Sequence, residues 1–228
     1  MKNRLLTRAV LIFALCVSAQ AATHWVGSWA ASQQLVEPQN SLAPADLRDA
    51  TLRQIVHLSI GGNELRVHLS NAFGTAPLRI DSVHIAHALS PAADRIDVST
   101  DQALTFAGKP YVTIPAGAEY ISDRVAFAAK PLSNLAITLY IHSPPAHETG
   151  HPGSRATSYM VHGDRAAARD FVKPKKIDHW YFISGVDVTA PRKSFAIAIL
   201  GDSITDGHAS TTNGNNRWPD VLAQRLQA

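Results

Sequence analysis

Apolar and polar residues alternate along most of the chain between residues 25 and 188, which predicts β-strands. The clearest run is residues 135–141, where leucine or isoleucine occupies every second position. Shorter runs predict strands over residues 78–86, 111–114, 124–128, 158–161 and 180–188. Because turn residues separate these runs, the pattern is typical of an antiparallel β-sandwich, and the fold class is predicted as mainly β.

A hairpin is predicted near the start of this region. Val56, Leu58 and Ile60 alternate with polar neighbours, and the same alternation returns over residues 65–69. Residues 61–63 between the two runs are Gly-Gly-Asn, which is turn chemistry, so the two runs are expected to pair. Helical patterns are scarce, and residues 44–52 are a candidate for one short helix.

The pattern changes after residues 189–193, which are interpreted as a joint. Residues 196–200 are uniformly apolar, as strands buried on both faces of a parallel sheet are. A loop rich in glycine and asparagine follows. Such a strand needs sheet neighbours and covering helices, so this unit is not expected to be a domain alone.

A helix is predicted after this loop, from Arg217 onward. Asn216 is the expected N-cap, and Pro219 is tolerated in the first turn. Helical spacing puts four apolar residues on one face, namely Trp218, Val221, Leu222 and Leu226.

The first 21 residues have the pattern of a secretory signal peptide. Basic residues precede an apolar run over residues 9–17, which is too short to span a bilayer as a helix, and Ala-Gln-Ala precedes a cleavage site after Ala21. The prediction is a secreted or periplasmic protein with no membrane anchor after cleavage. An uncleaved anchor and a lipoprotein attached through Cys16 fit the pattern less well.

Removal of residues 1–21 changes the charge balance. The chain has 21 Lys and Arg against 18 Asp and Glu, and three of the basic residues but no acidic residue lie in this segment. The remaining chain has no formal net charge, which gives no reason to expect nucleic acid as a partner. Cys16 is the one cysteine, so the mature protein can form no disulfide.

Residues 201–207, Gly-Asp-Ser-Ile-Thr-Asp-Gly, are the strongest functional signal. Ser203 follows the carboxyl end of a predicted strand, where open α/β sheets place their reactive groups. A small residue before the serine favours a tight turn, and a helix soon after it offers N–H groups to an oxyanion. The α/β-hydrolase elbow G-x-S-x-G does not fit, because Thr205 replaces its second glycine.

This segment resembles block I of the GDSL, or SGNH, hydrolases, with Ile204 in place of the usual leucine. Residues 216–219, Asn-Arg-Trp-Pro, resemble the start of the first helix in that family, and residues 25–32 look like the start of a β-rich leader domain found in some secreted bacterial SGNH esterases. The resemblance implies a β-sandwich leader domain over residues 22–190. Residues 194–228 would then be the first β-loop-α unit of a flavodoxin-like α/β domain.

The resemblance implies a serine ester hydrolase that uses no metal or other cofactor. Ser203 would be the nucleophile, and its backbone N–H would be one oxyanion donor. The family's other donors come from a glycine block and an asparagine block, and its His and Asp from a D-x-x-H block, all normally after block I. Residues 22–228 alone are therefore expected to be inactive. Asn213, Gly214 and Asn215 lie before the first helix and are not assigned to the asparagine block. The implied substrates are small-molecule or carbohydrate esters with short acyl groups.

Two other segments match catalytic motifs. Asp81 and His84 fit D-x-x-H, but they precede Ser203, and strand periodicity places them on opposite faces. Residues 147–151 fit H-E-x-x-H, which binds zinc only when both histidines share a helical face. Neighbouring prolines and Gly150 predict a loop there instead of a helix.

The alternative to an esterase is a β-sandwich that acts as a carbohydrate-binding or interaction module. Trp25, Trp29 and Trp180 would stack on sugars if exposed, although most aromatic residues of a sandwich belong to its core. Four histidines in strand patterns are expected to be partly exposed sheet residues, namely His57, His68, His84 and His87.

Overall fold

The computed structural model describes residues 23–228, so the predicted signal peptide lies outside the described residues. Residues 23–191 are mainly β and form antiparallel sheets, as the alternation predicted. This part is called the β body below. Residues 192–228, called the tail, contain the helix α1 (Trp218–Gln227). None of the helices within residues 23–228 has the length and apolar character needed to cross a membrane.

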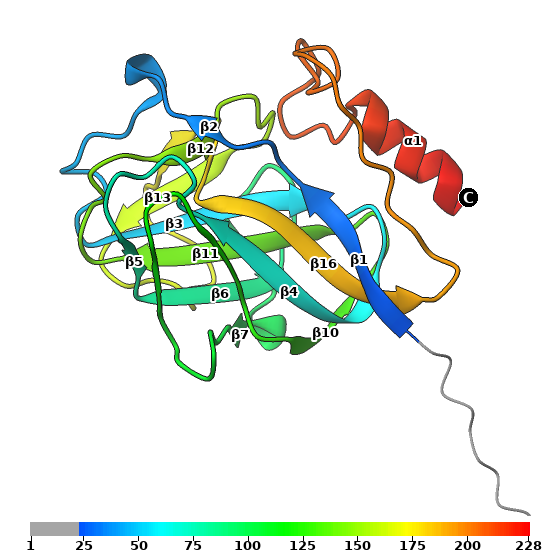
Figure 1. Ribbon diagram of the computed structural model, residues 1–228, viewed down its shortest axis with the longest axis horizontal. Coiled ribbons are helices and arrows are strands. Elements are labelled where there is room, and N and C mark those ends of the chain that lie inside the picture. Colours follow the sequence, from blue (N-terminus) through cyan, green and yellow to red (C-terminus); the bar gives the residue numbers. More distant parts are fainter. Residues whose placement is uncertain (1–22) are drawn as a thin grey trace, which may run out of the picture.

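The β body is built around two large sheets (Figure 1). The first sheet has the strand order β1 (Thr23–Ala30), β16 (Ile183–Pro191), β4 (Gly62–Ser70) and β10 (Val125–Ala129), with β9 (Glu119–Ile121) also paired to β4. The second has the order β14 (Lys175–Ile177), β13 (Ser158–His162), β3 (Ala50–His57), β11 (Asn134–Ile141), β6 (Ser82–His87) and β7 (Gln102–Ala103).

Two smaller sheets complete the β body. One contains β15 (Trp180–Tyr181), β12 (Thr149–His151) and β2 (Gln34–Leu35), and the other pairs β5 (Leu78–Ile80) with β8 (Val112–Ile114). Short 3₁₀ turns form at Pro38–Asn40 and Val98–Thr100. Residues 44–49 form turns and β3 starts at residue 50, so the short helix considered over residues 44–52 does not form.

The two large sheets share one apolar core. Leu65 and Val67 of β4 contact the same cluster of buried side chains as Leu135 and Ile137 of β11. Complete burial of such a side chain contributes about 1.5–3 kcal/mol to stability. The alternating residues of the predicted strands are therefore the inward faces of two packed sheets.

The hairpin predicted around residues 61–63 is wrong. β3 pairs with β11 and β13 in one sheet, whereas β4 pairs with β16, β10 and β9 in the other. The connection crosses between the sheets, and the backbone N–H of Leu58 donates to the carbonyl oxygen of Ser133 (2.9 Å). Leu58, just after β3, and Leu65 of β4 lie in the same core. Alternation identified the inward face of each strand but not its pairing partner.

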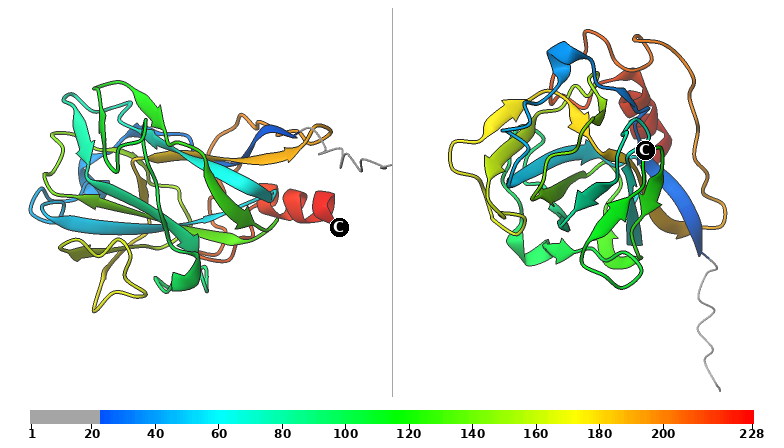
Figure 2. Two further views of the ribbon diagram at one scale, coloured as in Figure 1. Left: turned by 90° about the horizontal axis from the view of Figure 1, so that it is seen from below. Right: turned by 60° about the vertical axis from the view of Figure 1, so that its left-hand side comes forward.

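The strand predicted over residues 196–200 does not form either. Residues 195–200 are all exposed, and the exposed fraction reaches 77% at Phe195 and 101% at Leu200. A strand apolar on both faces requires hydrogen-bonded neighbours and covering layers. Within residues 23–228, no strand pairs with this segment. It runs outside the sheets (orange in Figure 2).

The predicted helix of the tail is confirmed as α1, but its N-cap is Arg217 and not Asn216. The carboxylate of Asp220 accepts a hydrogen bond from the backbone N–H of Arg217 (3.1 Å), and Pro219 lies in the first turn. The side chain of Asn216 accepts from the N–H of Thr211 instead (3.1 Å). This bond closes the loop before the helix.

The exposure of residues 195–200 yields a stability prediction. Leu200→Asn should change the free energy of unfolding in urea by less than about 0.5 kcal/mol, because the leucine makes no buried contact to lose. The same variant should bind less of the apolar dye ANS. Leu139→Asn in the core is the matched control and should cost about 2–5 kcal/mol. A loss at Leu200 as large as at Leu139 would mean that the segment is packed in solution.

Candidate functional site

Ser203 lies exposed in a turn formed by residues 203–209. The backbone N–H of Asp206 donates to the carbonyl oxygen of Asp202 (3.0 Å), and the N–H of His208 donates to the carbonyl oxygen of Ser203 itself (2.7 Å). Among residues 23–228, the N–H of Ser203 donates to no acceptor. The hydroxyl and the N–H of this serine are thus available to a reactant from solvent.

Two glycines make the turn possible. A Cβ at Gly201 would lie 2.1 Å from Oγ1 of Thr205, so a larger residue would push the turn apart. Gly207 has a φ of +95°, which side chains rarely allow, and a Cβ there would lie 2.6 Å from Cγ of Arg217. A small residue before the serine, favoured from the sequence, is therefore a steric requirement of this turn.

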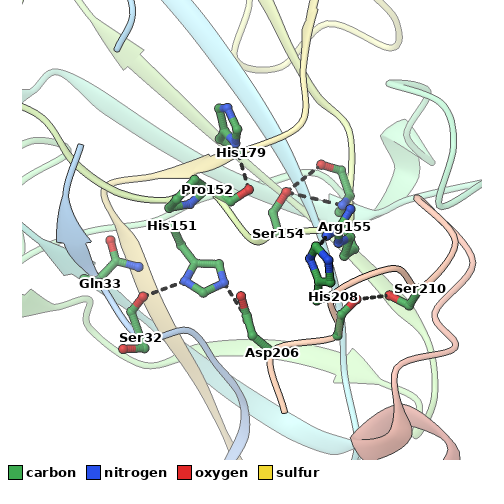
Figure 3. A network of polar contacts seen from close by, with 12 residues as sticks. Ser32, Gln33, His151, Pro152, Ser154, Arg155, His179, Asp206, His208 and Ser210 are labelled. Carbon is green, nitrogen blue, oxygen red and sulfur yellow. Dashed lines mark hydrogen bonds and ion pairs between the residues drawn. The ribbon is translucent and has the colours of Figure 1, made fainter. Parts of the chain in front are cut away.

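The turn is bound to the β body through His151 and Asp206 (Figure 3). Nε2 of His151 lies 2.8 Å from Oδ1 of Asp206, and Nδ1 lies 2.6 Å from the carbonyl oxygen of Ser32. A carbonyl and a carboxylate only accept, so both bonds form when each ring nitrogen bears a proton. The exposed fractions of the two side chains are 9% for His151 and 40% for Asp206.

Further contacts bind the loop between the turn and α1. Nη2 of Arg155 lies 3.2 Å from Nδ1 of His208. Asn213 donates its backbone N–H to the carbonyl oxygen of Arg155 (2.8 Å), and its side chain accepts from the N–H of Thr157 (2.7 Å) and donates to the hydroxyl of Thr157 (2.9 Å).

Asn215 binds at a second place on the β body. Its side-chain amide donates to Oδ1 of Asn134 (2.9 Å) and lies 3.1 Å from Nδ1 of His57. Asn213 and Asn215 therefore contact the β body, and neither forms a hydrogen bond with Ser203 among the described residues. Asn213 and Asn215 remain unassigned to the asparagine block.

Arg217 and His151 both pack on the ring of Trp180 where the tail meets the β body. The guanidinium of Arg217 lies over the Trp180 ring, 5.1 Å from its centroid, and the imidazole of His151 stacks on the same residue at 5.8 Å. Burial lowers the pKa of Arg217, although the nearby carboxylates of Asp220 and Asp206 oppose this shift. A partly buried cation on an aromatic face holds the start of α1 against the β body.

The H-E-x-x-H segment does not form a zinc site. Residues 149–151 are strand β12 and not the predicted loop, and a helix is absent there too. His147 is exposed, whereas Glu148 is buried and accepts from the N–H of Leu42 at both oxygens (3.1 and 3.2 Å). Among residues 23–228, no group of three or more His, Cys, Asp or Glu side chains is arranged to hold a metal ion.

Asp81 and His84 do not act as a pair. Oδ1 of Asp81 accepts from Nε of Arg79 (2.6 Å), whereas Nδ1 of His84 lies 2.9 Å from Oδ2 of Asp101. Asp81 lies between β5 and β6 and not within a strand, so the two side chains are separated by their different partners. His57, His68, His84 and His87 are all partly buried sheet residues, as expected.

The three tryptophans considered for sugar stacking are engaged within the protein. Trp180 is buried, Trp29 contacts it edge-on at 4.9 Å, and the guanidinium of Arg66 covers Trp25 at 4.6 Å. A surface cleft of about 530 Å³ is lined by residues that include His162, Phe171 and Lys175, and it contains no residue of the Ser203 turn.

The comparisons with known proteins add no family. The chain matches no protein-family model, and no curated protein is significantly similar to it. Residues 201–207 and their surroundings are therefore the basis for a functional proposal.

Glu148 yields a pH-dependence prediction. Burial raises its pKa above the usual value, and the bonds from Leu42 and Ser41 only partly oppose this. A raised pKa in the folded state means that this residue favours folding below the unfolded pKa and that this contribution is lost as the pH rises through the folded pKa. Glu148→Gln removes the titration, so the variant should gain stability relative to wild type between about pH 4 and pH 7.

Urea unfolding across this pH range measures the effect. Glu119→Gln, at an exposed position, is the control and should follow wild type at every pH. A Glu148→Gln variant whose stability falls relative to wild type as the pH rises would contradict the assignment.

Proposed function

We propose that the protein is a secreted serine hydrolase of carboxylic esters and that residues 194–228 begin its GDSL/SGNH-type catalytic domain. One observation supports this above the others. Residues 201–207 combine the Gly-Asp-Ser motif with an exposed Ser203 on a turn that two glycines make possible, shortly before a helix. A nucleophilic serine must be accessible to its substrate. The turn that contains Ser203 is also closed by backbone hydrogen bonds.

In the proposed reaction, Oγ of Ser203 attacks the ester carbonyl carbon while a histidine takes the hydroxyl proton. The tetrahedral oxyanion accepts a hydrogen bond from the N–H of Ser203. Its collapse releases the alcohol, which takes the proton from the histidine, and leaves an acyl-enzyme. The same histidine then takes a proton from water as the water oxygen attacks the acyl carbon; collapse of this second intermediate breaks the bond to Oγ, releases the carboxylic acid and returns the proton to Ser203. The histidine and its aspartate are expected from a D-x-x-H block of the family type.

The exposed segment 195–200 is consistent with this proposal. Its residues are apolar at every position, which suits a strand in the interior of a parallel sheet and does not suit contact with water. In the proposed domain, further strands would pair with it and helices would cover both faces. The turn with Ser203 would then follow the carboxyl end of a central strand.

The alternative, a carbohydrate-binding module without catalysis, has less support. The three tryptophans considered for sugar stacking do not support it, because Trp25, Trp29 and Trp180 pack on other residues of the β body. Within the esterase proposal, short-chain acyl esters, including acetylated carbohydrates, are the expected substrates.

The test compares two purified proteins on p-nitrophenyl acetate. One is the chain of residues 22–228, and the other is the product of the complete reading frame that contains it. The proposal predicts negligible hydrolysis by the first and turnover by the second. Ser203→Ala should lower kcat of the active product by at least about 10³-fold.

Ser194→Ala, which alters a neighbouring serine of the tail, is the matched control and should leave kcat unchanged. Turnover that survives Ser203→Ala, or a complete reading frame without hydrolase activity, would refute the esterase proposal.

A further inference from the structure

The end of β12 and the loop that follows it make two side-chain contacts with the Ser203 turn. His151 binds Asp206, and Arg155 contacts His208 four residues further along (Figure 3). Both partners belong to the turn, and both contact residues belong to the β body. The turn is thus held at two points from outside the tail.

Both carboxylate oxygens of Asp206 face the β body. Its Oδ1 faces Nε2 of His151, and its Oδ2 faces Gly153, where a Cβ would come within 1.8 Å of that oxygen. The glycine therefore leaves space that the carboxylate fills. The His151 ring is itself fixed by the carbonyl oxygen of Ser32 and by stacking on the buried ring of Trp180.

Two backbone hydrogen bonds connect these contact points to the serine. The N–H of Asp206 donates to the carbonyl oxygen of Asp202, and the N–H of His208 donates to the carbonyl oxygen of Ser203. The peptide groups on either side of Ser203 are thereby tied to the two residues that the β body holds. A shift of Asp206 would move the Ser203 peptide with it.

We propose that His151 is a positioning residue for the Ser203 turn and that the β body is consequently part of the catalytic site. His151 fixes Asp206, Asp206 fixes the turn, and the turn sets the direction of the Ser203 hydroxyl and N–H. The catalytic consequence rests on the proposed function, whereas the positional effect does not. In the sequence, His151 belongs only to the H-E-x-x-H match. Its contact with Asp206 is the basis of the positioning role.

Hydrogen exchange of the purified chain, followed by mass spectrometry, tests the positional effect. His151→Phe keeps the ring stacked on Trp180 but removes both hydrogen bonds. Exchange in residues 202–208 should become roughly tenfold faster, because the turn opens more often. Asp206→Leu should give the same increase, and the double variant should exchange no faster than either single variant. Asp206→Asn keeps an oxygen acceptor and should restore most of the protection.

His84→Phe is the matched control, because His84 pairs with Asp101 at 2.9 Å and is similarly buried. It should leave exchange in residues 202–208 unchanged. If His151→Phe does not fold, the exchange rates of Asp206→Leu and Asp206→Asn, which alter the partner in the tail, test the same contact. Exchange in residues 202–208 that matches wild type in His151→Phe, or in Asp206→Leu, would overturn the proposal.

Kinetic measurements on the product of the complete reading frame distinguish a failure of this inference from a failure of the proposed function. There, His151→Phe should lower kcat about tenfold or more with little change in KM, and Asp206→Asn should recover most of it. An activity that does not depend on Ser203 refutes the esterase proposal but leaves the exchange result valid. Faster exchange without a fall in a Ser203-dependent kcat overturns the catalytic part of the inference.

Discussion

The ring of Trp180 is the common packing surface for the two residues that hold the Ser203 turn and the start of α1, His151 and Arg217. Its Nε1 donates to the carbonyl oxygen of Ile55 in the core (3.1 Å), and Trp29 contacts its edge, so the ring has one orientation. His151 and Arg217 both pack on it. Because a core residue holds both of these side chains, the rigidity of the sheets extends to the turn that bears Ser203. The hydrogen bond between His151 and Asp206 then connects the Ser203 turn to this ring.

The strands could be predicted from the sequence because their cause is local. Alternation reflects burial of one face, and residues 135–141 form β11 as the pattern indicated. Pairing has a non-local cause, and the hairpin around residues 61–63 was wrong for that reason. Likewise, residues 195–200 have the composition of a buried strand, but composition cannot supply the neighbours that would bury them. They remain exposed in the described chain.

In the candidate site, too, the local motif could be predicted from the sequence and the long-range contact could not. Ser203 was recognisable because residues 201–207 form a local motif, and the glycines of that motif have a steric function that the structure makes explicit. The pairing of His151 with Asp206 joins residues far apart in the sequence, and no periodicity or spacing links them. β16 ends at Pro191, inside the predicted joint at residues 189–193, but the tail then returns to contact the β body, which the sequence did not indicate. A leader domain that merely precedes the motif would need none of these contacts.

Nuclear Overhauser measurements on the purified chain in solution test the central claim, that the β body holds the Ser203 turn. The structure predicts cross-peaks between the imidazole protons of His151 and the β protons of Asp206, and between the side-chain amide of Asn215 and the side chain of Asn134. Cross-peaks between His84 and Asp101 provide the internal reference. Observation of all three contacts would establish the attachment. Detection of the reference contact without the two contacts of the tail would contradict it.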